Sequence, residues 1–251
     1  MSEIKFGVIP AAGRGARMGY LSNLLPKCLF PLYDKPVIHA NVEKMVSLGI
    51  KAIYIIVHYQ KDKIKEYFKS VEDLLDVEIN FIEQEKLLGI ANAIMLTKDY
   101  LDTPFMVMLG DDCTIAKSLQ NLVNTFREKN AVALEAIVRE ENTEILKTTC
   151  CVKVNRNKQI TEIIEKPQVP SSNLRGCGIY FFQNSIYDYI GATPASSVRN
   201  EIEITDVIKL VAKEKLAFGE FINGLNMNIN SYLDLWKASN LVAELENKKL
   251  L

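Results

Sequence analysis

The segment over residues 10–17 combines small residues with a cationic side chain, directly after a short apolar run. Its small residues are Ala11, Ala12, Gly13, Gly15 and Ala16. Small residues let the backbone approach an anion closely, and successive backbone N–H groups form a nest for phosphate oxygens. The guanidinium of Arg17 would add a forked cationic donor to such a nest. The segment therefore predicts phosphate binding, although a plain tight turn after a strand would use the same glycines.

Two widespread nucleotide-binding motifs do not fit this loop. The pattern Gly-x-Gly-x-x-Gly would need glycine at position 18, which is Met18, and the P-loop would need Gly-Lys followed by Ser or Thr. A nicotinamide-binding oxidoreductase is therefore disfavoured. A phosphate bound by this loop would be held in a third way.

A lysine between prolines follows the loop. Lys27 lies in the stretch Leu25-Pro26-Lys27-Cys28-Leu29-Phe30-Pro31, which is otherwise apolar, and Asp34-Lys35-Pro36 comes next. By itself this pattern also suits a surface lysine between turn prolines.

The elements that would position these residues alternate in the first half of the chain. Apolar runs predict strands over residues 4–9, 52–57, 77–82 and 105–109, and helical spacing predicts helices over 36–48, 61–69 and 90–100. This alternation is typical of a doubly wound α/β sheet. Ligands of such sheets bind beyond the carboxyl ends of the strands, where this chain carries polar or glycine-rich sequence.

The second half is less regular. Strands are expected over residues 131–138, 151–154, 160–164, 177–182 and 217–222, and helices over 204–213 and 232–247. Ser231 followed by Asp234 resembles a capping box for the last helix, with Asp in place of Glu or Gln. We expect one domain over residues 1–251, with a nucleotide-binding half over 1–130 and a sugar-binding half over 131–251.

The composition is that of an ordinary globular protein. The chain has 251 residues, 48% hydrophobic and 24% charged residues, and a formal net charge of −1. No general basic surface for nucleic acid or anionic membrane is expected. No apolar run approaches the roughly 20 residues that span a bilayer, and the N-terminus does not resemble a signal peptide. The five cysteines fit free thiols in a reducing cytoplasm better than disulfides or zinc ligands.

Taken together, the glycine loop, Pro26-Lys27 and Asp34-Lys35-Pro36-Val37-Ile38 resemble the sugar nucleotidyltransferases. This family contains the glucose-1-phosphate thymidylyltransferases and uridylyltransferases. The resemblance runs from Ile4 to about Val242, and further motifs arrive in the family's order. It implies a Rossmann-like doubly wound mixed sheet with the architecture of GT-A-like nucleotide-diphospho-sugar transferases.

The resemblance implies roles for two nucleotide-side segments. In Glu83-Gln84-Glu85-Lys86-Leu87-Leu88-Gly89, Gln84 and Gly89 match the residues that read a pyrimidine base, and a glutamine amide offers both a donor and an acceptor. In Leu109-Gly110-Asp111, Asp111 matches a magnesium ligand that also contacts the nucleotide. A turn-forming aspartate after a strand is the plainer explanation of Asp111 alone.

The resemblance also implies a sugar side. In Glu165-Lys166-Pro167, Lys166 would contact the sugar phosphate and Glu165 the sugar hydroxyls. Gly178 would leave room for the sugar ring. The segment over residues 201–206 resembles a family signature, although Thr205 or Asp206 would also suit a helix cap. Arg199, just upstream, is a further candidate for the sugar.

Three positions depart from the family pattern. Asn228 stands where many members have an aspartate that is the second magnesium ligand, and an amide oxygen should bind Mg²⁺ less strongly than a carboxylate. Asp112 stands where Asn or another polar residue is common. Ala16 replaces a frequent threonine of the glycine loop. None of these changes removes a charged catalytic group.

The implied reaction is Mg²⁺-dependent transfer of a nucleotidyl group from UTP or dTTP to a sugar 1-phosphate, with glucose 1-phosphate as the expected acceptor. The sugar phosphate attacks the α-phosphorus in line and pyrophosphate leaves. Arg17 and Lys27 would stabilise the leaving group, Lys166 would place the sugar phosphate, and Asp111 with Asn228 would hold the metal. The anionic nucleophile needs no general base.

Two alternatives remain open from the sequence. A cytidylyltransferase acting on choline phosphate would use the same loop and lysine, although Glu165-Lys166-Pro167 favours a sugar. A regulatory subunit that binds sugar nucleotides without catalysis would be expected to lack Arg17, Lys27 or Asp111, and all three are present. Family analogy alone suggests a homo-oligomer.

Overall fold

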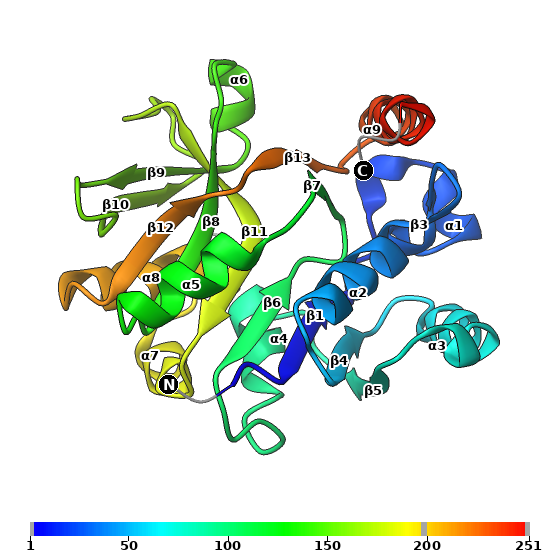
Figure 1. Ribbon diagram of the computed structural model, residues 1–251, viewed down its shortest axis with the longest axis horizontal. Coiled ribbons are helices and arrows are strands. Elements are labelled where there is room, and N and C mark those ends of the chain that lie inside the picture. The colour runs from blue at the N-terminus through cyan, green and yellow to red at the C-terminus, as the bar shows by residue number, and fades with distance from the viewer. Residues whose placement is uncertain (1–2, 197–199, 249–251) are drawn as a thin grey trace.

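A nine-stranded mixed sheet forms the centre of the computed structural model, which describes residues 3–196 and 200–248 (Figure 1). Seven strands lie in the order β10-β9-β11-β6-β1-β4-β5, and β8 joins the sheet beside β11 with β12 on its other side. The predicted doubly wound mixed sheet is confirmed.

The first half supplies the parallel part of the sheet. Its strands are β1 (Phe6–Pro10), β4 (Ala52–Val57), β5 (Glu78–Glu83) and β6 (Phe105–Met108), and they pair in parallel. The helices between them are α2 (Val37–Ser47), α3 (Lys61–Ser70) and α4 (Ile90–Met95). Strand β4 has the continuous apolar sequence Ala-Ile-Tyr-Ile-Ile-Val, which suits a central parallel strand that is covered on both faces.

The second half continues the same sheet. It contributes β8 (Ala133–Arg139), β9 (Cys150–Val154), β10 (Ile160–Glu165), β11 (Leu174–Phe182) and β12 (Ala217–Phe221). Its helices are α6 (Thr143–Leu146), α7 (Ile186–Ala192) and α8 (Ile204–Lys213), and α5 (Gln120–Glu128) lies at the end of the first half. Strand β11 pairs antiparallel with β6, so backbone hydrogen bonds join the two halves.

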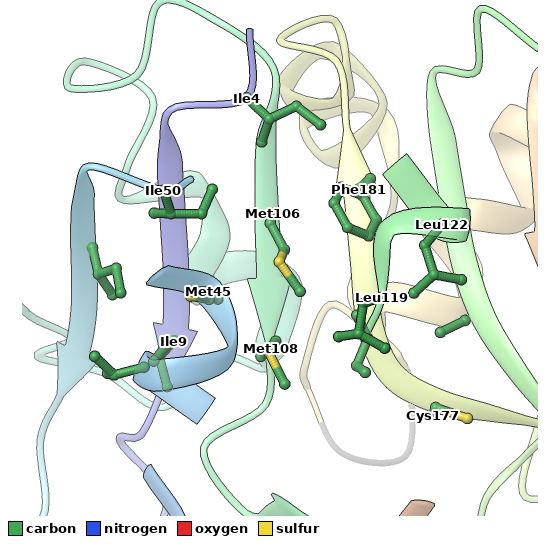
Figure 2. Close-up of a cluster of buried hydrophobic side chains, with 14 of the residues drawn as sticks. Ile4, Ile9, Met45, Ile50, Met106, Met108, Leu119, Leu122, Cys177 and Phe181 are labelled. Atoms are coloured by element: carbon green, nitrogen blue, oxygen red, sulfur yellow. The ribbon is translucent and has the colours of Figure 1, made fainter. Parts of the chain in front are cut away.

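Helices cover both faces of the sheet. On one face α2, α3 and α5 pack on the strands, and Figure 2 shows part of that cluster, with Met45 of α2, Leu122 of α5 and Met106 of β6. On the other face α4, α7 and α8 pack through side chains that include Ile94 and Val207. Burial of these apolar side chains is the main favourable contribution to folding.

A smaller unit stands beyond one end of the sheet. Strand β7 (Asp112–Ala116) pairs antiparallel with β13 (Gly224–Asn228), and the last helix, α9 (Tyr232–Asn247), packs beside them. The N-terminal segment here contains α1 (Leu21–Leu24), β2 (Pro31–Leu32), β3 (Lys35–Pro36) and 3-10 turns over Ala16–Met18 and Lys27–Leu29. A third such turn, Glu72–Leu74, follows α3. The backbone N–H of Tyr33 donates to the Ser239 hydroxyl at 2.8 Å, which holds the turn between β2 and β3 beside α9 (Figure 1).

Most expected elements are present, with informative differences. The strand over 52–57 and the helices over 204–213 and 232–247 have the expected bounds, and Ser231 and Asp234 form the predicted capping box. The helix expected over 90–100 ends at Met95, because the Thr97 hydroxyl donates to the Ile94 carbonyl at 2.7 Å and the chain turns. Strands β7 and β13 and helices α5 and α7 were not predicted.

All five cysteines lie in the described part of the chain, and each is buried and free. In the described ranges, no helix combines the length and the apolar character needed to cross a bilayer.

Candidate functional site

A pocket of about 380 Å³ opens beyond the carboxyl ends of β1, β5, β6 and β10, where the sequence predicted ligand binding. Twelve of the predicted site residues line it: Ala11, Ala12, Gly13, Arg17, Lys27, Gln84, Gly89, Asp111, Glu165, Lys166, Gly178 and Asn228. Segments from both halves of the chain therefore meet at one cavity. Gly15 is the predicted residue that does not line it.

Gly15 has a different place in the loop. Its φ is +66°, in the left-handed region, and an added Cβ would lie 2.8 Å from the Cβ of Lys27. Only glycine therefore lets the loop turn directly against the lysine stem. The neighbouring Arg14 guanidinium lies 5.6 Å from the centre of the Tyr59 ring, so Arg17 is the loop arginine that faces the pocket.

Lys27 and Asp111, which both line the pocket, form an ion pair. Their side chains are 12% and 31% exposed, so the pair is only partly screened by water. Pro26, whose ring fixes φ, has an extended conformation and directly precedes the 3-10 turn that begins at Lys27. Burial raises the pKa of the adjacent Cys28 thiol to about 12, so Cys28 is neutral beside this cation.

Asp111 and Asn228 supply oxygen atoms from two sides. Asp111 occupies the turn between β6 and β7, and its carbonyl accepts a hydrogen bond from the Ile229 N–H at 2.9 Å. The buried Oδ1 of Asn228 has no hydrogen-bond partner among the described residues. Within those residues there is no ready-made group of three His, Cys, Asp or Glu ligands. Mg²⁺ commonly takes one or two carboxylates and fills its shell with phosphate and water, so these hard oxygens fit that ion.

Gln84 is held against the start of α4. Its Nε2 donates to Asn92 Oδ1 at 2.9 Å and to the Gly89 carbonyl at 3.3 Å, and the residue is 4% exposed. Gly89 has φ +96°, and its segment is joined to the second half by a hydrogen bond of 2.8 Å from the Ile202 N–H to the Leu88 carbonyl. Asn92, which the sequence did not single out, thus orients the glutamine amide.

Glu165 and Lys166 form the opposite wall. Lys166 Nζ lies 3.1 Å from Glu165 Oε1, and the Lys166 backbone has a positive φ of 46° while its N–H donates to the Thr149 carbonyl at 2.9 Å. Non-glycine residues adopt this conformation rarely, and they concentrate at functional sites. Gly178 also lines the pocket with φ +63°, and a Cβ there would collide with the Asp112 carboxylate.

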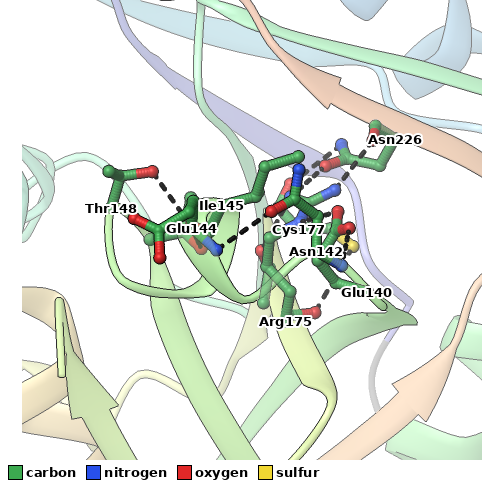
Figure 3. A network of polar contacts seen from close by, with 10 residues as sticks. Glu140, Asn142, Glu144, Ile145, Thr148, Arg175, Cys177 and Asn226 are labelled. Carbon is green, nitrogen blue, oxygen red and sulfur yellow. Dashed lines mark hydrogen bonds and ion pairs between the residues drawn. The ribbon is translucent and has the colours of Figure 1, made fainter. Parts of the chain in front are cut away.

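Arg175 was missed by the sequence reasoning, although it lines the pocket and is only 5% exposed. Its Nη1 donates to Asn226 Oδ1 and its Nη2 to the Asn226 carbonyl, each at 2.8 Å, and Nε lies 3.7 Å from Glu140 Oε2 (Figure 3). Asn226 Nδ2 in turn donates to Thr114 Oγ1 at 3.0 Å. The network joins β11, β13 and β7. The sequence did offer one signal for Arg175, because it is the only charged residue in the otherwise apolar strand β11.

Two buried carboxyl groups were also missed. Asp112, 2% exposed, lines the pocket, and burial followed by the charge of Asp111 raises its pKa well above the usual range, opposed by Arg175. Glu135 lies behind the pocket wall with no exposed surface, and the Cys150 thiol donates to it at 3.4 Å. Burial raises the pKa of Glu135 to about 8.

The segment over residues 201–206, before and at the start of α8, differs from the sequence-based expectation for the helix cap. Thr205 lines the pocket, together with Glu201 and Glu203. The N-cap of α8 is Glu203, so the suggestion that Thr205 or Asp206 caps this helix was wrong. The helix begins one residue before Thr205, because Glu203 is still extended. Arg199 lies outside the described residues.

Comparison with known proteins adds the family context. A sequence profile described as "Nucleotidyl transferase" matches residues 6–244. The chain is 34% identical over 232 residues to the bifunctional protein GlmU of Methanocaldococcus jannaschii, covering 92% of this chain and 53% of that protein. It is 32% identical over 206 residues to the UTP–glucose-1-phosphate uridylyltransferase AglF of Haloferax volcanii, covering 82% of this chain and 83% of that protein.

The same relationship holds for solved structures. A UDP-glucose pyrophosphorylase complexed with UDP-glucose superposes with a TM-score of 0.86 at 25% identity, covering 96% of this chain and 99% of the other. The chain spans about half the length of the GlmU proteins that it matches.

Proposed function

Because the chain belongs to the nucleotidyl transferase family, we propose that it transfers a nucleotidyl group from UTP or dTTP to a sugar 1-phosphate and releases pyrophosphate. The family follows from the profile match over residues 6–244. The observation that carries the activity is that one pocket gathers the glycine loop, Lys27, Asp111 and the Glu165–Lys166 pair. Glucose 1-phosphate is the proposed acceptor, in keeping with the names of the AglF protein and the pyrophosphorylase.

Arg17, Lys27 and the loop act on the triphosphate. Backbone N–H groups of residues 11–13 bind phosphate oxygens, while Arg17 and Lys27 neutralise the negative charge that develops on the departing pyrophosphate. The Lys27–Asp111 ion pair keeps the ammonium in the pocket before substrate arrives. Since a bound triphosphate offers Lys27 a more highly charged partner, the lysine exchanges the carboxylate for phosphate.

Asp111 and Asn228 hold Mg²⁺ in this proposal. When bound, the ion neutralises charge on the α-phosphate and on the attacking phosphate. The unpartnered Asn228 Oδ1 supports this role, because a buried acceptor without a hydrogen bond is costly unless a ligand satisfies it. Release of Asp111 from Lys27 frees its carboxylate for the same ion.

Gln84 distinguishes among pyrimidines. Both hydrogens of its Nε2 are directed to Asn92 and Gly89, so Oε1 is the atom available to a base. An acceptor placed at N3 matches the N3–H of uracil or thymine, whereas cytosine has an acceptor at N3 and a donor only at its N4 amino group. This arrangement favours UTP or dTTP over CTP, and with it a sugar nucleotide over a choline phosphate product.

Glu165 and Lys166 position the acceptor. The Lys166 ammonium binds the sugar phosphate and the Glu165 carboxylate accepts hydrogen bonds from sugar hydroxyls. Gly178 lines the same pocket, and its missing Cβ leaves room for the Asp112 carboxylate. The attacking phosphate oxygen is already anionic, so catalysis rests on alignment and charge neutralisation.

The free buried thiols are consistent with a reducing compartment, so the cytoplasm is the proposed location. Family analogy favours a homo-oligomer.

The decisive experiment measures pyrophosphate release with Mg²⁺ over a grid of UTP, dTTP, CTP, ATP and GTP against several sugar 1-phosphates and choline phosphate. Release with UTP or dTTP and one sugar 1-phosphate is expected. Release only with CTP and choline phosphate would replace this proposal by the cytidylyltransferase. Binding of a sugar nucleotide by the folded protein without any release would replace it by a regulatory role.

A further inference from the structure

Asp112 lies opposite Asn228 in the two-stranded sheet of β7 and β13. The antiparallel register pairs these two residues directly, so their side chains project from the same face of the sheet. Both line the pocket. Asp111, the other oxygen donor considered above, is the immediate chain neighbour of Asp112.

The two facing side chains have the same unmet requirement. Asp112 Oδ1 and Asn228 Oδ1 are both buried, and neither has a hydrogen-bond partner among the described residues. Asp112 is 2% exposed, so bulk water does not satisfy its carboxylate. A buried oxygen without a hydrogen-bond partner is unfavourable in a pocket wall unless a ligand satisfies it.

The Arg175 guanidinium does not meet this requirement. Arg175 is buried beside β13, but its Nη1 donates to Asn226 Oδ1 and Gly176 O, and its Nη2 donates to the Asn226 carbonyl. The guanidinium therefore reduces the electrostatic cost of a carboxylate here without donating to Asp112. The Asn228 amide is a hydrogen-bonding neighbour of the Asp112 carboxylate, but Oδ1 of each residue is left without a partner, and a cation between the two strands satisfies both.

We propose that Asp112 is a third protein ligand of the divalent cation, with Asp111 and Asn228. Asn228 supplies a neutral oxygen, and Asp112 on the opposite strand supplies a carboxylate. The site therefore has the carboxyl groups of Asp111 and Asp112 and the amide of Asn228. That the ion is the Mg²⁺ of the reaction rests on the proposed function. That a cation binds at Asp112 rests only on the buried, unpartnered oxygens of Asp112 and Asn228.

Because residues 112 and 228 face each other, the carboxylate can be moved from one position to the other. If the cation needs a carboxylate on this face of the sheet, an aspartate at either position should supply it. Four proteins are compared by electron paramagnetic resonance titration with Mn²⁺, alone and with UTP: the wild type, Asp112→Asn, Asn228→Asp and the double variant Asp112→Asn/Asn228→Asp. Asp99→Asn, at an exposed turn, is the matched control for loss of one negative charge.

The expected result is a pattern of loss and recovery. Asp112→Asn weakens Mn²⁺ binding at least ~10-fold, the double variant recovers to within about 3-fold of the wild type, and Asn228→Asp binds at least as tightly as the wild type. Asp99→Asn leaves the affinity unchanged. Circular dichroism and urea unfolding verify that each variant is folded.

Three outcomes overturn the inference. These are unchanged Mn²⁺ affinity in folded Asp112→Asn, a double variant no better than Asp112→Asn, and a wild type that binds no Mn²⁺ even with UTP. Should Asp112→Asn fail to fold, the double variant still decides, because it keeps one carboxylate on the face and must bind Mn²⁺ about as tightly as the wild type. Mn²⁺ binding with the predicted pattern but no pyrophosphate release would contradict the proposed function alone.

Discussion

Lys27 is the residue on which the proposed chemistry depends most. It faces the pocket, is paired with Asp111, and has its stem packed against Gly15. Lys27→Ala is expected to lower kcat/KM at least ~100-fold, equivalent to roughly 3 kcal/mol of transition-state stabilisation, because the leaving pyrophosphate loses a preorganised cation.

The control for this substitution is Lys51→Ala, at the amino-terminal end of β4, where the side chain is 69% exposed. Steady-state kinetics of both variants test the assignment. Turnover of Lys27→Ala within threefold of the Lys51→Ala value would remove Lys27 from the mechanism.

Glu135 predicts how stability depends on pH. Its pKa is raised from 4.5 to about 8 by burial, so between these values the folded protein holds a proton that the unfolded chain has lost. The free energy of unfolding therefore falls as pH rises through this window, by at most roughly 5 kcal/mol. Glu135→Gln removes this dependence and should be more stable relative to the wild type at pH 8 than at pH 5.

Urea unfolding at the two pH values measures the effect, with Glu128→Gln on the exposed side of α5 as the control. A difference between Glu135→Gln and the wild type that is the same at both pH values would mean that Glu135 is ionised in the folded protein.

At the scale of elements, the 84–89 segment contacts the segment before α8, and both segments line the pocket. Gly89 is the closest point, because an added Cβ would lie 2.6 Å from the Ile202 carbonyl and the backbone φ is +96°. Gly89→Ala is expected to cost about 1–3 kcal/mol of stability and to raise KM for the nucleotide more than it lowers kcat.

Gly191→Ala is the matched control, since its Cβ would meet only Met95 Cε at 3.9 Å within the helical α7. It should be neutral or stabilise the protein by up to about 1 kcal/mol. Equal urea midpoints and equal KM values for the two alanine variants would show that the Ile202 contact is unimportant.

At the scale of the whole molecule, the two halves share one sheet through the β6–β11 pairing, and the pocket takes residues from both. The chain should therefore unfold as one cooperative domain. The single tryptophan, Trp236 in α9, reports on the end of the chain, whereas far-UV circular dichroism reports on all elements. Coincident urea transitions by the two probes are expected, and two separated transitions would divide the chain into independent domains.

The sequence by itself determined the elements whose signals are local. The β-branched run of β4, the capping box of α9 and the polar ends of successive strands all depend on neighbours a few residues away. Because parallel strands of a doubly wound sheet end at the same edge, those polar ends were expected to meet, and the predicted residues apart from Gly15 do line one pocket.

Only the tertiary structure decided which side chains complete that pocket. The β7–β13 pairing joins segments more than a hundred residues apart, so no local sequence pattern predicted that Asp112 faces Asn228. Arg175 and Glu135 have charged side chains in strands whose pattern is apolar, and burial with their particular partners gives them their properties. A residue type restricts the chemistry that is available, whereas desolvation and the partner across the sheet determine how that chemistry is used.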